Sequence, residues 1–260
     1  MNEKPAAPVP APWRRGPIEG VSCSAAILAL VPLLTLYCAD APRATSRKDI
    51  VSTGKPRYSM HKEETIIRDF FQDRRGGFFL DVGCWHPIIA SNTYYLEEHL
   101  GWSGFGVDAL PEMARKWKRN RPASKFFNYI VIDHADTVES FYRMDLSDIS
   151  SIQKPPPAPS GGPSKVEEIK VPTITLTKLL DEHGVSKIDF LSIDIEGAEP
   201  LALAGFDIDR FKPELVCIEA KPRNREFIMK YFADHGYERI ERYLKYDDMN
   251  YYFTPKVKAQ

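Results

Sequence analysis

From residue 58 onward, short apolar runs alternate with amphipathic segments, and this alternation constrains the fold more than any other feature of the chain. Apolar runs rich in β-branched and aromatic residues predict strands, whereas apolar positions three and four apart predict helices. The expected strands are 77–82, 104–108, 125–131, 188–194, 214–219, 237–242 and 249–254. The expected helices are 61–73, 91–99, 111–120, 175–183, 199–204 and 223–235. The pattern predicts an α/β domain with a mostly parallel sheet and helices on both faces.

The composition is typical of one globular domain that carries a tail. Of the 260 residues, 43% are hydrophobic and 27% are charged, values that argue against a fibrous or wholly disordered protein. The formal net charge of −1 gives no basic field that would concentrate the chain on nucleic acid, so we expect no nucleic-acid partner. Four cysteines without a CxxC pair indicate neither a zinc knuckle nor a disulfide framework, and no residue is assigned as a metal ligand.

The first 57 residues are expected to lie outside the folded domain, which we place at residues 58–260. Residues 1–20 are rich in proline and alanine and predict a disordered arm. Residues 22–39 form an uncharged apolar leader, close to the lower limit of the ~17 to 25 residues that cross a bilayer. It is interpreted as a membrane anchor before a cytoplasmic domain, as a signal peptide, or as a segment that docks on a cytoplasmic domain. Residues 40–57 are a polar and basic linker.

A second segment of low complexity interrupts the domain itself. Residues 153–165 read QKPPPAPSGGPSK, and the consecutive prolines exclude both a helix and a paired strand. The segment is therefore expected to be a surface loop.

Acidic residues end four of the expected strands. They are Asp81, Asp108, Asp194 and Glu219. In an open parallel sheet, ligands bind beyond the carboxyl ends of the strands, so these acids are candidates for a binding site. Asp108 follows Asp81 near the ~20-residue interval at which dinucleotide-binding folds place an acid on ribose hydroxyls. The alternative for Asp108 is a solvated acid at a strand end.

The loop after Asp81 departs from a dinucleotide-binding turn. Gly83 permits a tight turn, and Ser91 or Asn92 is suited to cap the following helix. The loop between them is several residues longer than a G-x-G-x-x-G turn, which argues against the pyrophosphate of NAD or FAD. His86 lies within it and is a candidate base at neutral pH, although a lone loop histidine is more often incidental.

Residues 188–200, IDFLSIDIEGAEP, hold the densest group of candidate catalytic side chains. Asp194, Glu196 and Glu199 follow one apolar strand, and Gly197 allows a sharp turn between them. Crowded carboxylates can raise one another's pKa and create a general base, or they can bind a divalent cation. The alternative is that Glu196 and Glu199 only complement the N-terminus of the next helix.

Four segments taken together carry a resemblance to a known family. They are YSMHKEETI, FFLDVGCWHPIIASNTYYLEEHLGWSGFGVDALPE, VPTITLTKLLDEHGVSKIDFLSIDIEGAEPLALAGFD and LVCIEA. In this order they resemble the FkbM family of S-adenosylmethionine-dependent methyltransferases over residues 58–255. The resemblance implies a class I, Rossmann-like methyltransferase fold, with a doubly wound seven-stranded sheet whose last strand runs antiparallel.

The resemblance also implies roles for individual residues. Asp81 and Gly83 would line the methionine end of S-adenosylmethionine, Asp108 would hold the ribose, and Asp133 would approach the adenine. The candidate cofactor-binding residues are Asp81, Gly83, Cys84, Asn92, Asp108, Ala109 and Asp133. The chain departs from the family pattern at His86, Pro87, Asp108 and Ala109, and Pro87 removes a backbone donor next to the expected methionine pocket.

Three functions follow from these observations. The leading hypothesis is methyl transfer from S-adenosylmethionine to a hydroxyl of a sugar, glycan or natural product. Asp194 is the first candidate for the base, Glu196 is the second and His86 is the third. The second is a methyltransferase fold without activity that scaffolds a membrane assembly through residues 22–39. The third is an NAD-dependent oxidoreductase, which the length of the loop after Gly83 disfavours.

Overall fold

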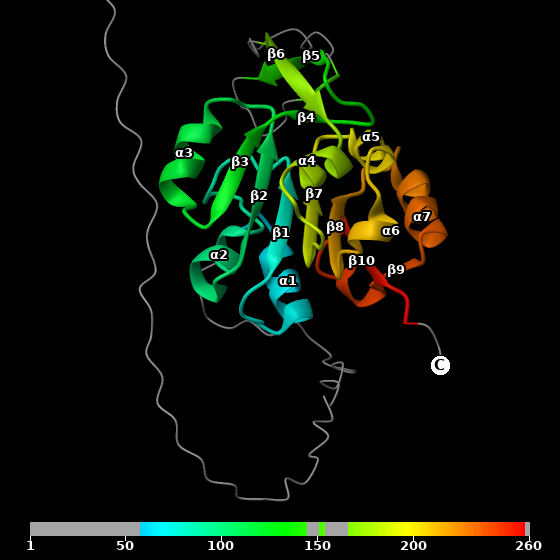
Figure 1. The fold of residues 1–260 in the computed structure, drawn as a ribbon. Coiled ribbons are helices and arrows are strands. Elements are labelled where there is room, and N and C mark those ends of the chain that lie inside the picture. The colour runs from blue at the N-terminus through cyan, green and yellow to red at the C-terminus, as the bar shows by residue number, and fades with distance from the viewer. Residues whose placement is uncertain (1–57, 145–150, 154–165, 258–260) are drawn as a thin grey trace, which may run out of the picture. The chain divides into compact units, whose positions relative to one another are not determined.

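The computed structural model describes residues 58–144, 151–153 and 166–257, and its main feature is a seven-stranded sheet (Figure 1). The strand order is β3-β2-β1-β7-β8-β10-β9. β10 runs antiparallel to both of its neighbours, and the neighbouring pairs from β3 to β8 are all parallel. The strands are β1 (Phe78–Val82), β2 (Ser103–Asp108), β3 (Ser124–Asn128), β7 (Phe190–Ile193), β8 (Leu215–Glu219), β9 (Tyr237–Arg239) and β10 (Asn250–Pro255).

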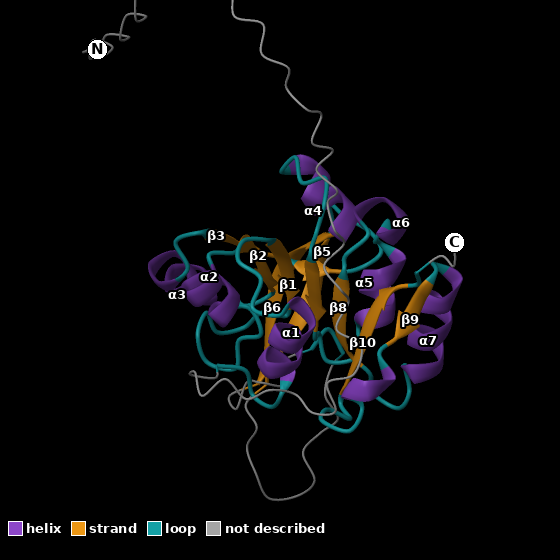
Figure 2. Cartoon of the chain, turned by 90° about the horizontal axis from the view of Figure 1, so that it is seen from below, coloured by secondary structure: helices purple, strands orange, loops and turns teal. Residues whose placement is uncertain are grey.

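Helices cover both faces of this sheet, as the sequence predicts. On one face are α1 (Glu63–Phe71), α2 (Tyr94–Leu100) and α3 (Met113–Asn120). On the other are α4 (Leu176–Glu182), α5 (Glu199–Ala204), α6 (Ile208–Phe211) and α7 (Arg225–Asp234). Figure 2 shows α4 and α6 on the opposite side of the sheet from α1. The short helix α6 is not among the expected helices, because its four residues are too few to show a helical period.

The alternation of side chains along each strand decides which residues enter which core. Leu80 and Val82 of β1 contact the α4–α7 layer, whereas Phe79 packs with α1 and α2. The same alternation places Leu191 and Phe190 of β7 on opposite faces. Buried apolar side chains on both faces explain why the strand runs in the sequence are nearly continuous.

A second, smaller sheet contains β4 (Ile130–Val131), β6 (Val166–Ile174) and β5 (Val138–Met144), in that order. Figure 1 shows it beyond the carboxyl ends of β1 and β2. The sequence prediction is incomplete here. The expected strand 125–131 is divided between the two sheets, and neither β5 nor β6 is predicted. β5 is mostly half-buried, and the first half of β6 is mostly exposed. Both strands carry charged side chains such as Arg143 and Glu167, which form a cross-strand ion pair, so neither shows a continuous apolar run.

Other sequence predictions can be compared directly with the fold. Each of the seven expected strands has a counterpart in the main sheet, where β3 represents the first part of 125–131. The strand expected at 237–242 ends at Arg239 and is followed by the 3-10 helix η1 (Glu241–Tyr243). Most of the predicted proline-rich loop, residues 154–165, lies outside the described residues, as does the apolar leader at 22–39. Within the described part of the chain, no helix combines the length and apolar character that crossing a membrane requires.

Candidate functional site

The carboxyl ends of β1, β2, β7 and β8 lie together and carry the four acids that the sequence analysis identifies at strand ends. Asp81 has the same strand parity as Phe79, so its side chain leaves the sheet on the α1 face. A cavity of about 510 Å³ opens at this edge, within the range typical of small-molecule sites. Eight predicted site residues line it: Asp81, Gly83, Cys84, Asn92, Asp108, Ala109, Asp194 and Glu196.

The structure does not bring His86 to this cavity. The Nδ1 atom of His86 accepts the backbone N–H groups of Ile88 at 3.2 Å and of Ile89 at 3.1 Å. Partial burial and the nearby Lys116 ammonium lower the pKa of His86. The carbonyl oxygen of Pro87 points to Arg121, which donates to it from Nη1 at 3.1 Å. His86 and Pro87, the first two departures from the family pattern, therefore lie outside the described cavity wall.

Asp133 is likewise outside the cavity lining. Its carboxylate pairs with the ring of His134 at 2.8 Å, and its side chain is 46% exposed. The residues before it, Ile130 and Val131, line the cavity instead. They form β4, which pairs with β6, and this pairing directs the chain away from the cavity before Asp133 is reached. The sequence spacing alone did not reveal the turn, because the two-residue strand is too short to show a period.

Asp108 is buried at the end of β2 and is held by the backbone. Its Oδ2 accepts the N–H of Trp85 at 2.8 Å, and its Oδ1 accepts the N–H of Leu110 at 2.9 Å. Burial raises the pKa of Asp108 to about 6, although both hydrogen bonds favour the ionised form. Each carboxylate oxygen has a second lone pair, so the side chain can still accept hydrogen bonds from hydroxyl groups of a ligand in the cavity.

A buried network fixes the loop that joins β1 to α2. Thr93 donates from Oγ1 to Asp81 at 2.6 Å, and Arg121 donates from Nη2 to Thr93 at 3.1 Å. Arg121 also forms an ion pair with Glu97 at 2.6 Å, and neither side chain is more than 6% exposed. The N-cap of α2 is Thr93 rather than the expected Ser91 or Asn92, but Ser91 accepts the N–H of Tyr94, the first residue of the helix, at 3.1 Å. The SNT-x-x-LE sequence thus supplies the capping, bridging and ion-pairing groups that hold Asp81 at the cavity.

Gly83 is required by the close approach of two strand ends. Its φ of 80° lies in the left-handed region, and a Cβ at this position would lie 1.7 Å from the carbonyl oxygen of Asp194. The backbone N–H of Asp194 donates to the carbonyl of Val82 at 2.9 Å, which holds the two chains together. Gly83 therefore joins the β1 and β7 sides of the cavity, and any larger residue would separate them.

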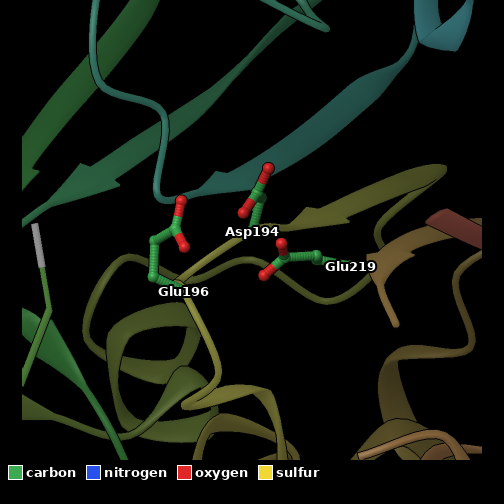
Figure 3. A group of neighbouring side chains, drawn as sticks. All are labelled: Asp194, Glu196 and Glu219. Atoms are coloured by element: carbon green, nitrogen blue, oxygen red, sulfur yellow. The ribbon is translucent and has the colours of Figure 1, made fainter. Parts of the chain in front are cut away.

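Three carboxylates from β7, its following loop and β8 meet at one side of the cavity. Oxygens of Asp194, Glu196 and Glu219 all lie within 4.8 Å of one another, and Figure 3 shows the three groups converging. Lys221 forms ion pairs with Glu196 and, at 3.3 Å, with Glu219. Glu219 is predicted from the sequence only as a strand-end acid, and Lys221 is not predicted. A lysine two positions after a strand-end acid was the available signal.

The environment raises the pKa of two members of this cluster. Asp194 is exposed at the cavity, yet the surrounding protein desolvates its carboxylate. This desolvation, followed by the charges of Glu219 and Glu196, raises its pKa well above the usual value. Burial raises the pKa of Glu219 to about 7, although Lys221 acts to lower it. A member of such a cluster can act as a base. The negative charge of the three carboxylates and their close spacing would also allow the cluster to hold a cation.

Residues 81–244 match the Methyltransferase FkbM domain family, over more than half of the chain. The chain belongs to the FkbM methyltransferase family. Membership and the strand order, with its antiparallel β10, identify the class I methyltransferase fold that the sequence resemblance predicts. The chain is therefore assigned to the S-adenosylmethionine-dependent methyltransferases. None of the proteins with curated functions matches the sequence.

Several solved structures are similar to the FkbM domain at low sequence identity. A TehB-like SAM-dependent methyltransferase from Corynebacterium glutamicum is 16% identical, with a TM-score of 0.42 over 76% of this chain and 89% of that chain. Precorrin 8w decarboxylase from Methanobacterium thermoautotrophicum is 13% identical, with a TM-score of 0.41 over 74% and 80%. A Burkholderia thailandensis N1-methyltransferase with bound 1,6-didemethyltoxoflavin and S-adenosylhomocysteine is 12% identical, with a TM-score of 0.35 over 74% of each chain. At these scores the neighbours support no statement about substrate.

The last acid of the SIDIEGAE signature of the FkbM domain is structural. Glu199 is fully buried, and its Oε1 accepts the N–H groups of Ile195 at 3.2 Å and Gly197 at 2.9 Å. Asn224 donates from Nδ2 to its other oxygen at 2.9 Å. Glu199 thereby shapes the turn that carries Glu196, which has a φ of 58° in the left-handed region. Glu199 lies in the first turn of α5, but its carboxylate accepts hydrogen bonds from the loop before the helix and from Asn224 rather than from the N–H groups of α5.

The residues of the FkbM domain fit S-adenosylmethionine better than a dinucleotide. This cofactor has one ribose, and Asp108 faces the cavity with free acceptor capacity for its two hydroxyls. It has no pyrophosphate, which agrees with a first loop that lacks a compact glycine turn.

Proposed function

We propose that this FkbM domain methylates a hydroxyl group of a sugar, glycan or natural product and takes the methyl group from S-adenosylmethionine. The observation that carries the proposal is the position of Asp194, a carboxylate open to the cavity at the carboxyl end of β7. When bound, S-adenosylmethionine supplies a methyl group that is already electrophilic. The protein then has to position the acceptor and remove the hydroxyl proton.

The cofactor side of the proposal rests on β1 and β2. Asp108 accepts the ribose hydroxyls with the lone pairs that Trp85 and Leu110 leave free. Asp81 and Gly83 face the methionine end, where the Thr93 bond at 2.6 Å keeps the Asp81 carboxylate in place. Hydrogen bonds to a carboxylate held in place by its neighbours are strong and directional, so these contacts set the orientation of S-adenosylmethionine as well as its affinity.

The acceptor side rests on β7 and the loop that follows it. Asp194 accepts the hydroxyl proton, and its raised pKa makes it a stronger base than an aspartate with the usual pKa. Among the described residues, no side chain donates a hydrogen bond to the Asp194 carboxylate, whereas Glu196 is paired with Lys221. Asp194 is therefore better placed for proton transfer than Glu196.

The remaining wall of the cavity suits a small hydroxylated acceptor. Met60, Phe141 and Met249 supply apolar surface, while His61 and Asn250 supply hydrogen-bonding groups. Mixed walls of this kind bind ligands through apolar contact and select them by a few polar contacts. We therefore propose a small molecule or a terminal glycan unit as the acceptor.

The substitution Asp194→Asn tests this assignment. Purified protein is supplied with S-adenosylmethionine and a panel of hydroxylated glycans, and formation of S-adenosylhomocysteine is measured. With an acceptor that the wild type uses, we expect Asp194→Asn to lose about 10²- to 10⁴-fold in kcat, the contribution of a general base. Asp133→Asn, which alters an acid outside the cavity lining, serves as the matched control. Full turnover by Asp194→Asn with normal cofactor binding would exclude Asp194 as the base.

A further inference from the structure

The three carboxylates beside the proposed acceptor site form an arrangement that needs a positive charge. Oxygens of Asp194, Glu196 and Glu219 lie within 4.8 Å of one another, and carboxylates at such separations repel one another strongly in a partly dehydrated site. Proteins commonly compensate a group of three carboxylates with Mg²⁺ or Ca²⁺, which take oxygen ligands. The structure offers a different source of charge.

The ammonium group of Lys221 lies inside this arrangement. Its Nζ pairs directly with Oε2 of Glu196 and lies 3.3 Å from Oε2 of Glu219. Among the described residues that line the cavity, Lys221 is the only lysine or arginine. It follows the end of β8 by two positions, so the strand that carries Glu219 also sets the place of the lysine.

We propose that Lys221 is a positioning residue whose ammonium occupies the place of a divalent cation in the carboxylate cluster. The inference rests on the proposed function and adds the source of positive charge at the same site. By pairing with Glu196 and Glu219, Lys221 gathers two of the three carboxylates and leaves Asp194 free to face the acceptor. A tethered ammonium needs no coordination shell of fixed geometry, whereas Mg²⁺ requires near-octahedral oxygen ligands at about 2.0–2.1 Å.

This arrangement implies a potential metal site that the ammonium group of Lys221 occupies in the wild type. A divalent ion can bind the cluster in the wild type only by displacing an ammonium that already pairs with two of its ligands. Removal of that ammonium leaves three carboxylates with no lysine or arginine among the described lining residues. A neutral residue at position 221 should therefore convert the cluster into a cation-binding site.

Electron paramagnetic resonance of added Mn²⁺ tests the inference without an acceptor. Mn²⁺ prefers oxygen ligands and loses its free-ion signal when bound. We expect Lys221→Ala and Lys221→Gln each to bind one Mn²⁺ per chain at least tenfold more tightly than the wild type. Lys221→Arg, which restores a cation, should behave as the wild type. Lys178→Ala removes a lysine from a surface pair with Asp136 and is the matched control. Adding Glu219→Gln to Lys221→Ala should weaken Mn²⁺ binding again by at least tenfold.

Two outcomes would overturn the inference. Equal Mn²⁺ affinity in the wild type and Lys221→Ala would show that the lysine does not hold the place of a cation. Absence of Mn²⁺ binding in both neutral variants, with normal circular dichroism, would show that the carboxylates are compensated in another way. Titration of the same wild-type sample with S-adenosylhomocysteine tests the proposed function separately, because that ligand reports on the β1 and β2 side of the cavity.

Discussion

The strand-end acid Asp108 should make cofactor affinity depend on pH. Burial raises its pKa to about 6, and only the ionised carboxylate offers both oxygens as acceptors to ribose hydroxyls. A group with this pKa is about 91% ionised at pH 7 and about 9% ionised at pH 5. If binding requires the ionised form, the dissociation constant for S-adenosylhomocysteine should rise about tenfold between pH 7 and pH 5, or about 1.4 kcal/mol. S-adenosylhomocysteine should therefore bind tightly above pH 6 and progressively more weakly below it.

Calorimetric titration at pH 5, 6, 7 and 8 and constant ionic strength measures this effect. Asp108→Asn removes the titrating group, so its affinity should be lower than that of the wild type at pH 7 and should change less than about twofold between pH 5 and 7. Asp133→Asn alters an acid that does not line the cavity and should retain the full pH dependence. The comparison separates Asp108 from Asp194 and Glu219, which remain in all three proteins.

Two results would refute the reasoning about Asp108. The first is a wild-type affinity that is constant from pH 5 to pH 7. The second is an Asp108→Asn variant that keeps the tenfold change, since the titration would then belong to another group.

Two substitutions in the cavity scaffold give further tests. Gly83→Ala should abolish S-adenosylhomocysteine binding, because its Cβ would lie 1.7 Å from a backbone oxygen. The control Gly101→Ala should retain binding, because Gly101 also has a positive φ, 69°, but a Cβ there would have no atom within 4 Å. Urea unfolding should show that Gly101→Ala costs only about 1–2 kcal/mol, and equal loss of binding in both variants would contradict the steric argument. Arg121→Met should lower the free energy of unfolding by about 3–5 kcal/mol, because it leaves Glu97 buried and unpaired. Adding Glu97→Gln should recover part of that loss, and a cost below about 1 kcal/mol for Arg121→Met would contradict a structural role for the pair.

The main sheet could be predicted from the sequence because its strands are buried on both faces. FLSI is buried at every position and FFLDV at every position after Phe78, and such runs are visible without knowledge of neighbours. β5 and β6 were missed because their stability comes largely from pairing with each other. Their charged residues, such as Arg143 and Glu167, occupy half-buried or exposed positions, and a pairing partner cannot be read from local composition.

The cavity residues at strand ends could be predicted from the sequence, whereas those held by contacts with distant residues could not. Asp81, Asp108 and Asp194 follow apolar strands directly, so the general location of ligands in parallel sheets was enough to select them. Arg121 and Lys221 reach their partners across gaps of 24 and 25 residues, from Glu97 and Glu196. No periodicity links either residue to its distant partner, and only the spacing of Lys221 from Glu219 is visible in the sequence.

The most direct measurement of the central claim is a calorimetric comparison of S-adenosylhomocysteine with NAD on the wild-type protein at pH 7. The cavity has a ribose acceptor at Asp108 and no compact glycine turn for a pyrophosphate. We therefore predict saturable binding of S-adenosylhomocysteine with a micromolar dissociation constant and no heat from NAD. Heat from NAD alone, or none from either ligand, would contradict the assignment of this cavity to S-adenosylmethionine.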